Sequence, residues 1–101
     1  MARTIIWTEA ALQDLAEAAE FIAQDSKFYA KSFVKEARQA ARSLKRFAER
    51  GRVVPELGAP EIRELFVGRY RLIYKIESTK AVYVVRFIHG ARDFRALWRN
   101  N

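Results

Sequence analysis

Alternating apolar and polar residues predict three consecutive β-strands in the second half of the chain. The stretches IRELFV (62–67), YRLIYKI (70–76) and AVYVVRFIH (81–89) are rich in β-branched and aromatic residues, which pack well on a pleated surface. Gly68–Arg69 and the polar residues around Ser78–Lys80 separate these stretches, and residues of these types favour turns. We therefore predict three strands joined by short turns.

The N-terminal half changes from a short strand to a helical period. RTIIW (3–7) is β-prone, and Thr8 then offers a helix N-cap. Apolar residues recur at spacings of three and four up to about Asp25, and again after Ser26, a second N-cap candidate. Gly51 is a natural residue to end the second helix at its C′ position. We therefore predict two amphipathic helices, joined at Asp25–Ser26 into a hairpin.

The order of these elements predicts the fold class. The segment RVVPELGAPE (52–61) is expected to be a loop, because two prolines and a glycine interrupt it. The order is then β-α-α-β-β-β with a short C-terminal tail, in which DFRALWRN has room for a helical turn or more. A single α+β domain covering residues 1–101 follows, with two layers: the helical hairpin packs on one face of a mostly antiparallel sheet.

Strand alternation assigns side chains to the two faces of the sheet. The face expected to meet the helices carries Tyr70, Leu72, Tyr74 and Ile76. In the last strand, one face carries Val82, Val84, Arg86 and Ile88 and the other carries Tyr83, Val85, Phe87 and His89. Arg71, Lys75 and Arg86 are expected on the open face, because an unpaired buried guanidinium is costly. The same parity turns His89 toward the helices or the rim of the core, unless a bulge near Gly90 reverses it.

Positive charge is unevenly distributed along the chain. Lys and Arg number 19 against 12 Asp and Glu, and residues 51–101 hold ten of the basic and only five of the acidic side chains. Eight of those ten are arginines, whose planar fork suits phosphates and carboxylates. Nucleic acid, an acidic protein, or each in turn are therefore candidate partners. The alternative is that the positive charge keeps a small domain soluble.

Candidate catalytic chemistry is limited by the scarcity of suitable side chains. With one histidine, no cysteine and scattered carboxylates, neither a metal site nor a cofactor is expected. Phosphodiester cleavage needs a base, an acid and cations, and the candidate bases are His89 and Glu64. A histidine at a strand end is more often structural, and Glu64 favours a salt bridge to a neighbouring arginine. Trp98 either packs back on the sheet or is displayed for a partner.

The apolar pattern gives no indication of export or of a membrane. MARTIIWTEAAL reaches polar residues soon after Trp7, too early for the apolar region of a signal peptide. No apolar run approaches membrane-spanning length, and the absence of cysteine fits a reducing compartment. We expect a cytoplasmic protein with no membrane partner.

The motifs VVPELG, IREL, G-x-YRLIY and HGARD occur together in this short chain. They resemble toxins of the RelE/ParE superfamily, the toxic halves of bacterial type II toxin–antitoxin pairs, and the likeness covers nearly the whole chain. The resemblance implies a cognate ParD-like antitoxin whose acidic C-terminal segment wraps the toxin in a hetero-oligomer. Such a segment would lay a helix along the apolar groove of the helical hairpin and could add a strand at a sheet edge.

The superfamily has two branches with different activities. RelE-like toxins cut messenger RNA in the ribosome, whereas ParE-like toxins are described as poisons of DNA gyrase that block replication. The RelE arginines fall on Arg71 and Arg92, but the RelE lysines fall on Ile62 and Glu64 and the C-terminal tyrosine falls near Trp98. The phrases VVPELG, IREL and HGARD look like ParE. The resemblance therefore favours a ParE-like gyrase inhibitor, with a RelE-like ribosome-dependent endoribonuclease as the alternative.

Two sets of candidate binding residues follow. The candidates for binding the target are Arg63, Arg69, Arg71, Arg86, Arg92, Arg95, Trp98 and Arg99. The candidates for binding the antitoxin are Phe21, Phe28, Tyr29 and Phe33, which exceed what one narrow apolar stripe needs; alternatively, they simply cover the sheet. No catalytic residue is expected in a gyrase inhibitor, whereas the endoribonuclease alternative would use Arg71, Arg92 and His89. A third possibility is a relic that is harmless but still binds its antitoxin.

Overall fold

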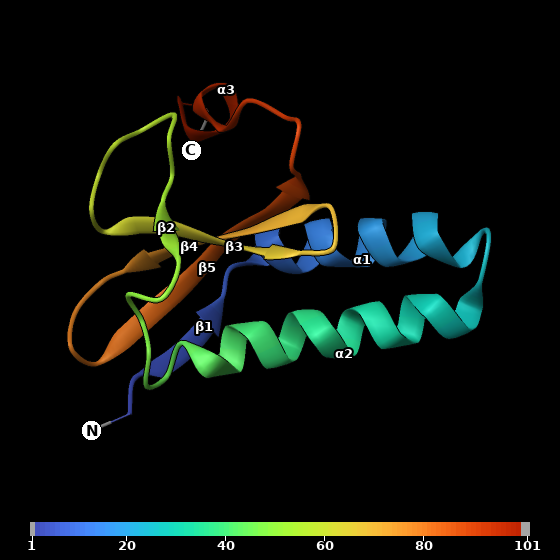
Figure 1. Ribbon diagram of the computed structural model, residues 1–101, viewed down its shortest axis with the longest axis horizontal. Coiled ribbons are helices and arrows are strands. Elements are labelled where there is room, and N and C mark those ends of the chain that lie inside the picture. Colours follow the sequence, from blue (N-terminus) through green and yellow to red (C-terminus); the bar gives the residue numbers. More distant parts are fainter. Residues whose placement is uncertain (1, 100–101) are drawn as a thin grey trace.

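The computed structural model describes residues 2–99, apart from the side chain of Arg99. The elements are β1 (Thr4–Trp7), α1 (Glu9–Ala23), α2 (Lys27–Ser43), β2 (Arg52–Val53), β3 (Ile62–Val67), β4 (Tyr70–Ile76), β5 (Ala81–His89) and α3 (Phe94–Arg99). Figure 1 shows α1 and α2 lying side by side as a hairpin, with α3 on the other side of the molecule near the loop that follows β2. The predicted α+β class is confirmed.

One five-stranded sheet has the order β1-β5-β4-β3-β2. β1 pairs with β5 in parallel, and every other pair is antiparallel, so the mostly antiparallel sheet is confirmed. The three long strands have the predicted bounds, and the N-terminal strand begins one residue later than predicted. β2 lies within the segment predicted to be a loop; its two residues pair with β3, and two residues are too few to show alternation.

Both predicted N-caps are confirmed. The hydroxyl of Thr8 accepts a hydrogen bond from the Ala11 amide and that of Ser26 from the Tyr29 amide, each at 3.1 Å, which satisfies amides that the first helical turn leaves unpaired. The predicted C-terminus of the second helix is wrong. Gly51 was expected to follow the last helical turn directly, whereas α2 ends at Ser43.

Gly51 has a different role from the predicted helix cap. A Cβ at this position would lie 2.5 Å from the Tyr74 hydroxyl oxygen and 2.6 Å from the Glu64 carbonyl oxygen, so close packing requires glycine here. The buried Tyr74 hydroxyl accepts from the Gly51 amide at 3.0 Å and donates to the Ala48 carbonyl at 2.6 Å. Burial raises the pKa of this phenol. Tyr74 thereby fixes the segment that joins α2 to β2.

Both faces of the sheet are covered, which corrects the prediction of one open face. The helical hairpin covers a core that includes Leu15, Ala37, Leu44, Leu72, Tyr74, Val82, Val84 and Phe87. On the opposite face, the loop after β2 and α3 close over Val54, Ile62, Ile73, Ile88 and Phe94. Those isoleucines alternate onto this face along β3, β4 and β5, and burying them favours a covering layer.

A bulge in β5 changes the predicted parity of that strand. Ile73 pairs with Arg86, but the next residue of β4, Tyr74, pairs with Val84, so Val85 is an extra residue in β5. Val84 therefore faces the hairpin together with Phe87, and the prediction that Val82 and Val84 share a face with Arg86 is wrong. The bulge lies inside the strand and not near Gly90.

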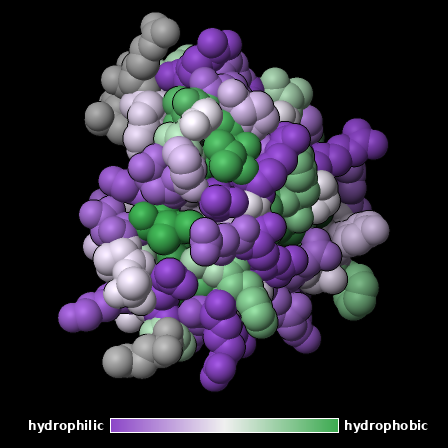
Figure 2. Space-filling model, turned by 60° about the vertical axis from the view of Figure 1, so that its left-hand side comes forward, coloured by the Kyte–Doolittle hydropathy of each residue, from purple (hydrophilic) through white to green (hydrophobic). Residues whose placement is uncertain are grey.

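The view in Figure 2 shows hydrophilic side chains over most of the exposed surface, with apolar side chains in smaller patches between them. No helix within residues 2–99 is long and apolar enough to cross a membrane.

Candidate functional site

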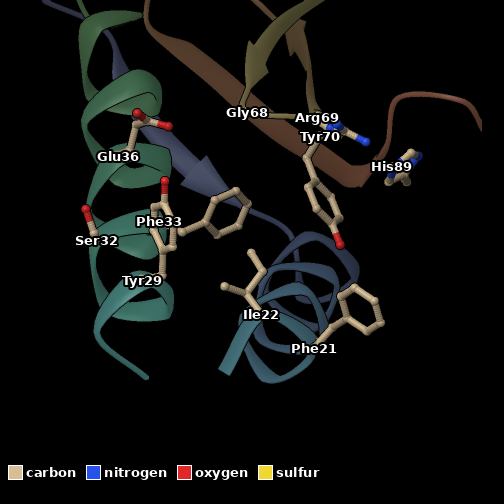
Figure 3. A pocket seen from close by; sticks show the side chains of 10 residues that line it. All are labelled: Phe21, Ile22, Tyr29, Ser32, Phe33, Glu36, Gly68, Arg69, Tyr70 and His89. Carbon is tan, nitrogen blue, oxygen red and sulfur yellow. The ribbon is translucent and has the colours of Figure 1, made fainter. Parts of the chain in front are cut away.

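A groove of ≈ 590 Å³ lies between the helical hairpin and the turn that joins β3 to β4. Its lining residues are Phe21, Ile22, Tyr29, Ser32, Phe33, Glu36, Gly68, Arg69, Tyr70 and His89. Figure 3 shows side chains from both helices and from the sheet arranged around the opening. The structure therefore brings three of the four candidate antitoxin-binding residues to one place.

The aromatic residues of the groove have different degrees of burial. Phe33 is half-buried at its base and makes edge contacts with Tyr70 and Phe87, with ring centroids 5.4 and 5.7 Å apart. Phe21 and Tyr29 are 66% and 69% exposed. Phe33 thus covers the sheet, whereas Phe21 and Tyr29 form an exposed apolar surface of the kind that marks interaction sites.

Phe28, the fourth candidate, is 84% exposed but is not among the residues that line the groove.

Polar side chains flank the apolar surface on two sides. Ser32 and Glu36 project from α2, and Arg69 of the β3–β4 turn and His89 of β5 lie across the opening (Figure 3). The groove therefore offers an apolar floor between an acidic and a basic wall.

Arg71 is buried, so the prediction that it lies on an open face is wrong. It is 3% exposed, and its guanidinium donates to both oxygens of Glu56 at 2.9 and 2.7 Å and to Glu64 at 2.9 Å. A further bond reaches the Arg92 carbonyl, while Nε has no partner among the described residues. The Glu56 hydrogen bonds raise the pKa of Arg71. The charge of this arginine is thus neutralised inside the protein.

Glu64 and Glu56 complete this buried network. The Glu64 side chain is 0% exposed and also accepts from Arg52 at 2.6 Å, which confirms the predicted salt bridge and leaves this carboxylate unavailable as a base. Glu56 accepts from the Phe94 amide at 3.0 Å, which links the loop after β2 to the start of α3. Hydrogen bonding from Arg71 lowers the pKa of Glu56 to about 2.

We predict that Glu56 makes stability dependent on acidity. Because its pKa in the folded state is about 2 and its ordinary value is 4.5, its contribution of about 2–3 kcal/mol is present above about pH 5 and is lost as the pH falls toward 2. Urea unfolding of Glu56→Gln should therefore show a deficit near neutral pH that shrinks in acid. Glu61→Gln is the matched control, since Glu61 is exposed and forms no ion pair among the described residues. A deficit that stays constant across this range would contradict the prediction.

The other predicted arginines separate into paired and accessible ones. Arg86, expected on the open face, instead forms a two-bond ion pair with Asp14 of α1 at 2.6 and 3.0 Å, which raises its pKa. Arg95 pairs with Asp93 at 3.5 Å, and Arg63 donates to the backbone carbonyls of Glu49, Gly51 and Pro60.

Arg69 and Arg92 are exposed, and their side chains form no ion pair within the described part of the chain. Trp98 is half-buried and packs on Phe94, with ring centroids 5.7 Å apart, so it lies back on the sheet side. The side chain of Arg99 lies outside the described residues.

His89 lies on the hairpin side of the sheet, as parity predicted. It is exposed, its Nδ1 accepts from the Ala91 amide at 3.3 Å, and its ring meets Tyr70 edge-on at 5.5 Å. A small hollow of ≈ 200 Å³ places it beside Glu17 and Arg92. The structure thus brings the side chains of His89 and Arg92 to one hollow, which Arg71 does not line; the Arg71 guanidinium contacts only the backbone carbonyl of Arg92.

Within residues 2–99, no three or more His, Cys, Asp or Glu side chains gather as a metal site would require. The arrangement therefore consists of an apolar groove, a neutralised internal arginine and exposed arginines at the rim.

Comparison with known proteins gives consistent matches. The family described as "ParE toxin of type II toxin-antitoxin system, parDE" matches residues 5–94. The chain is 34% identical over 88 residues to Toxin RelE2 of Caulobacter vibrioides. This match covers 87% of this chain and 96% of that protein. A chain of the structure described as "Chromosomal ParDE TA system from P. aeruginosa" superposes with a TM-score of 0.70 at 18% identity, covering 87% of this chain and 96% of that one. The last match shows a shared fold.

Proposed function

The chain belongs to the ParE toxin family of type II toxin–antitoxin systems, and from this premise we propose that it inhibits DNA gyrase and blocks replication until an antitoxin neutralises it. The burial of Arg71 is the observation that carries the choice of target. An arginine that stabilises the charge of a cleaving phosphate must be able to reach that phosphate. Arg71 is 3% exposed and bound by two carboxylates, so it cannot approach a substrate without breaking this network.

The groove supports the antitoxin half of the proposal. An amphipathic helix could place its apolar side on Phe21, Tyr29 and Phe33 and its charged flanks against Glu36 and Arg69, the mode in which helices bind grooves. We assign this groove to the C-terminal segment of a ParD-like antitoxin, which makes a toxin–antitoxin hetero-oligomer the resting state.

The accessible arginines support a target-binding role at the rim. Arg69 and Arg92 remain exposed, and Arg95 is exposed beside its partner Asp93. Arg63, Arg71 and Arg86 are occupied by contacts within the fold. We propose that Arg69, Arg92 and Arg95 contact gyrase. Arg63, Arg71 and Arg86 would instead stabilise the fold.

The test of gyrase inhibition is a search for trapped cleavage complexes. Purified toxin, gyrase and plasmid DNA are incubated and then treated with detergent and protease. We expect linear plasmid that increases with toxin concentration, because a poisoned enzyme holds broken DNA. Premixing the toxin with its antitoxin should abolish the linear product.

One observation favours the endoribonuclease as a second candidate. His89, Glu17 and Arg92 line the same hollow, which places a possible base, a carboxylate and a cation together, and one relative is named Toxin RelE2. This candidate requires new messenger RNA ends during translation in vitro, and His89→Gln should remove them. If translation proceeds on intact messenger RNA in the presence of excess toxin, the candidate is excluded.

A further inference from the structure

The exposed side of α2 carries a continuous row of positive charge. This row, named here the α2 ridge, consists of Lys27, Lys31, Lys35, Arg38 and Arg42 of α2, together with Lys45 in the turn that follows the helix. The spacings of three and four residues keep the five helical cations, from Lys27 to Arg42, within an arc of roughly 80° and a length of about 22 Å. All six are exposed, while Ala30, Ala37 and Ala41 are buried against the core.

The α2 ridge lacks internal partners. None of its six side chains forms an ion pair with any residue in the described range 2–99. In contrast, Arg52, Arg71, Arg86 and Arg95 of the arginine-rich second half of the chain all pair with carboxylates. Residues 27–46 contain seven basic side chains and one acidic one, which is a net charge of +6 within a chain of net charge +7. Much of the positive charge without an ion pair within residues 2–99 therefore lies on α2 and the turn that follows it.

We propose that the α2 ridge binds the phosphate backbone of double-stranded DNA without regard to sequence. Protein–DNA interfaces are polar and strongly positive, whereas protein–protein interfaces are depleted in lysine. Six exposed cations in one row fit the first kind of surface. Lysine and arginine contacts to phosphate fix position but do not read bases, and four of the six cations are lysines.

The α2 ridge is separate from the antitoxin groove. The groove is lined by Tyr29, Phe33 and Glu36 from α2, and no residue of the ridge is among its lining residues. A small hollow of ≈ 140 Å³ adjoins the ridge, where Arg38, Arg42 and Lys45 meet Ile5 and Trp7. The choice of DNA over RNA rests on the proposed function, because gyrase holds a DNA duplex.

Fluorescence anisotropy with a labelled duplex of about 20 base pairs of arbitrary sequence tests this inference. Six phosphate contacts predict that log K falls with log salt with a slope of about −5. The double variant Lys31→Gln/Lys35→Gln should bind about tenfold more weakly and reduce that slope by about two. The matched control is Lys75→Gln/Lys80→Gln, which removes the same charge from the sheet end; its affinity should stay within about threefold of the wild type.

Four outcomes would overturn the inference. They are equal losses in the ridge and control variants, no duplex binding at about 50 mM salt, tighter binding to an RNA duplex of the same length, and binding only to a polyglutamate peptide. Circular dichroism of each variant establishes that it is folded. If gyrase is unaffected while ridge-dependent DNA binding persists, the proposed target is wrong and the α2 ridge remains a DNA-binding surface.

Discussion

Replacing Arg71 with methionine is expected to lower the free energy of unfolding by about 3–5 kcal/mol, because removing one member of a buried ion pair strands its partners. Glu64 is 0% exposed and Glu56 is 15% exposed at their side chains, so both carboxylates would lose the guanidinium with little access to water in its place. The link from Glu56 to the Phe94 amide extends the effect to the packing of α3. Urea unfolding near neutral pH, followed by circular dichroism, measures the change.

Arg69→Met is the control for this variant. Arg69 lies in the turn after Gly68, is exposed and forms no ion pair within the described residues, so its loss should change the free energy of unfolding by no more than about 0.5 kcal/mol. If Arg71→Met were as stable as this control, Arg71 would not be held by the network. It would then be free to contact a target, and the case against a nuclease would lose its main support.

Removing the two exposed aromatic residues of the groove is expected to uncouple toxin from antitoxin. Phe21→Ser/Tyr29→Ser should raise the Kd for the cognate antitoxin at least about 100-fold, because aromatic anchors each contribute about 2 kcal/mol or more to an interface. The fold should tolerate both changes, since these side chains are 66% and 69% exposed. Isothermal titration calorimetry against the antitoxin's C-terminal segment measures the affinity.

Phe47→Ser is the matched control, because Phe47 is 64% exposed but does not line the groove. Its affinity for the antitoxin should match that of the wild type. Phe28→Ser then tests the remaining candidate, which is exposed but also outside the groove lining. Equal affinity of the double variant and the wild type would show that the antitoxin binds elsewhere.

The predictable part of the fold depends on long periodic segments. β3, β4 and β5 have the predicted bounds because six to nine residues of strand-forming character, ended by turn residues, define where each strand begins and ends. Local hydrogen bonds fixed the starts of both helices at Thr8 and Ser26. β2 and the end of α2 were not predictable in this way, because Gly51 is held by the distant Tyr74 hydroxyl and not by the helix that precedes it.

The wrong predictions about the site residues share one cause: the positions of these residues depend on tertiary contacts that the sequence pattern does not show. Parity correctly put Arg71 on the face opposite the helices, but the sequence could not show that a loop brings Glu56 onto it. A single bulge at Val85 altered the facing of β5. Among the residues that line the groove, Phe21 and Tyr29 were predicted because the helices carry more aromatic residues than one apolar stripe needs. Tyr70 and Glu36 were missed, because their place in the lining depends on how the hairpin meets the β3–β4 turn.

The location of the unpaired positive charge was the feature least predictable from the sequence. The arginine-rich second half looked like the binding surface, yet four of its arginines are paired with carboxylates. The helical spacing of the basic residues in α2 is visible in the sequence. What made the α2 ridge significant was the pairing of charges elsewhere, which only the folded chain establishes.

A supercoiling assay with purified toxin, gyrase, relaxed plasmid and ATP decides the main proposal. We expect toxin to stop the conversion of relaxed to supercoiled plasmid, and an equimolar amount of antitoxin to restore it. Translation in vitro with the same toxin preparation should leave messenger RNA intact. Normal supercoiling at excess toxin, together with new messenger RNA ends in the translation reaction, would contradict gyrase inhibition and establish the endoribonuclease.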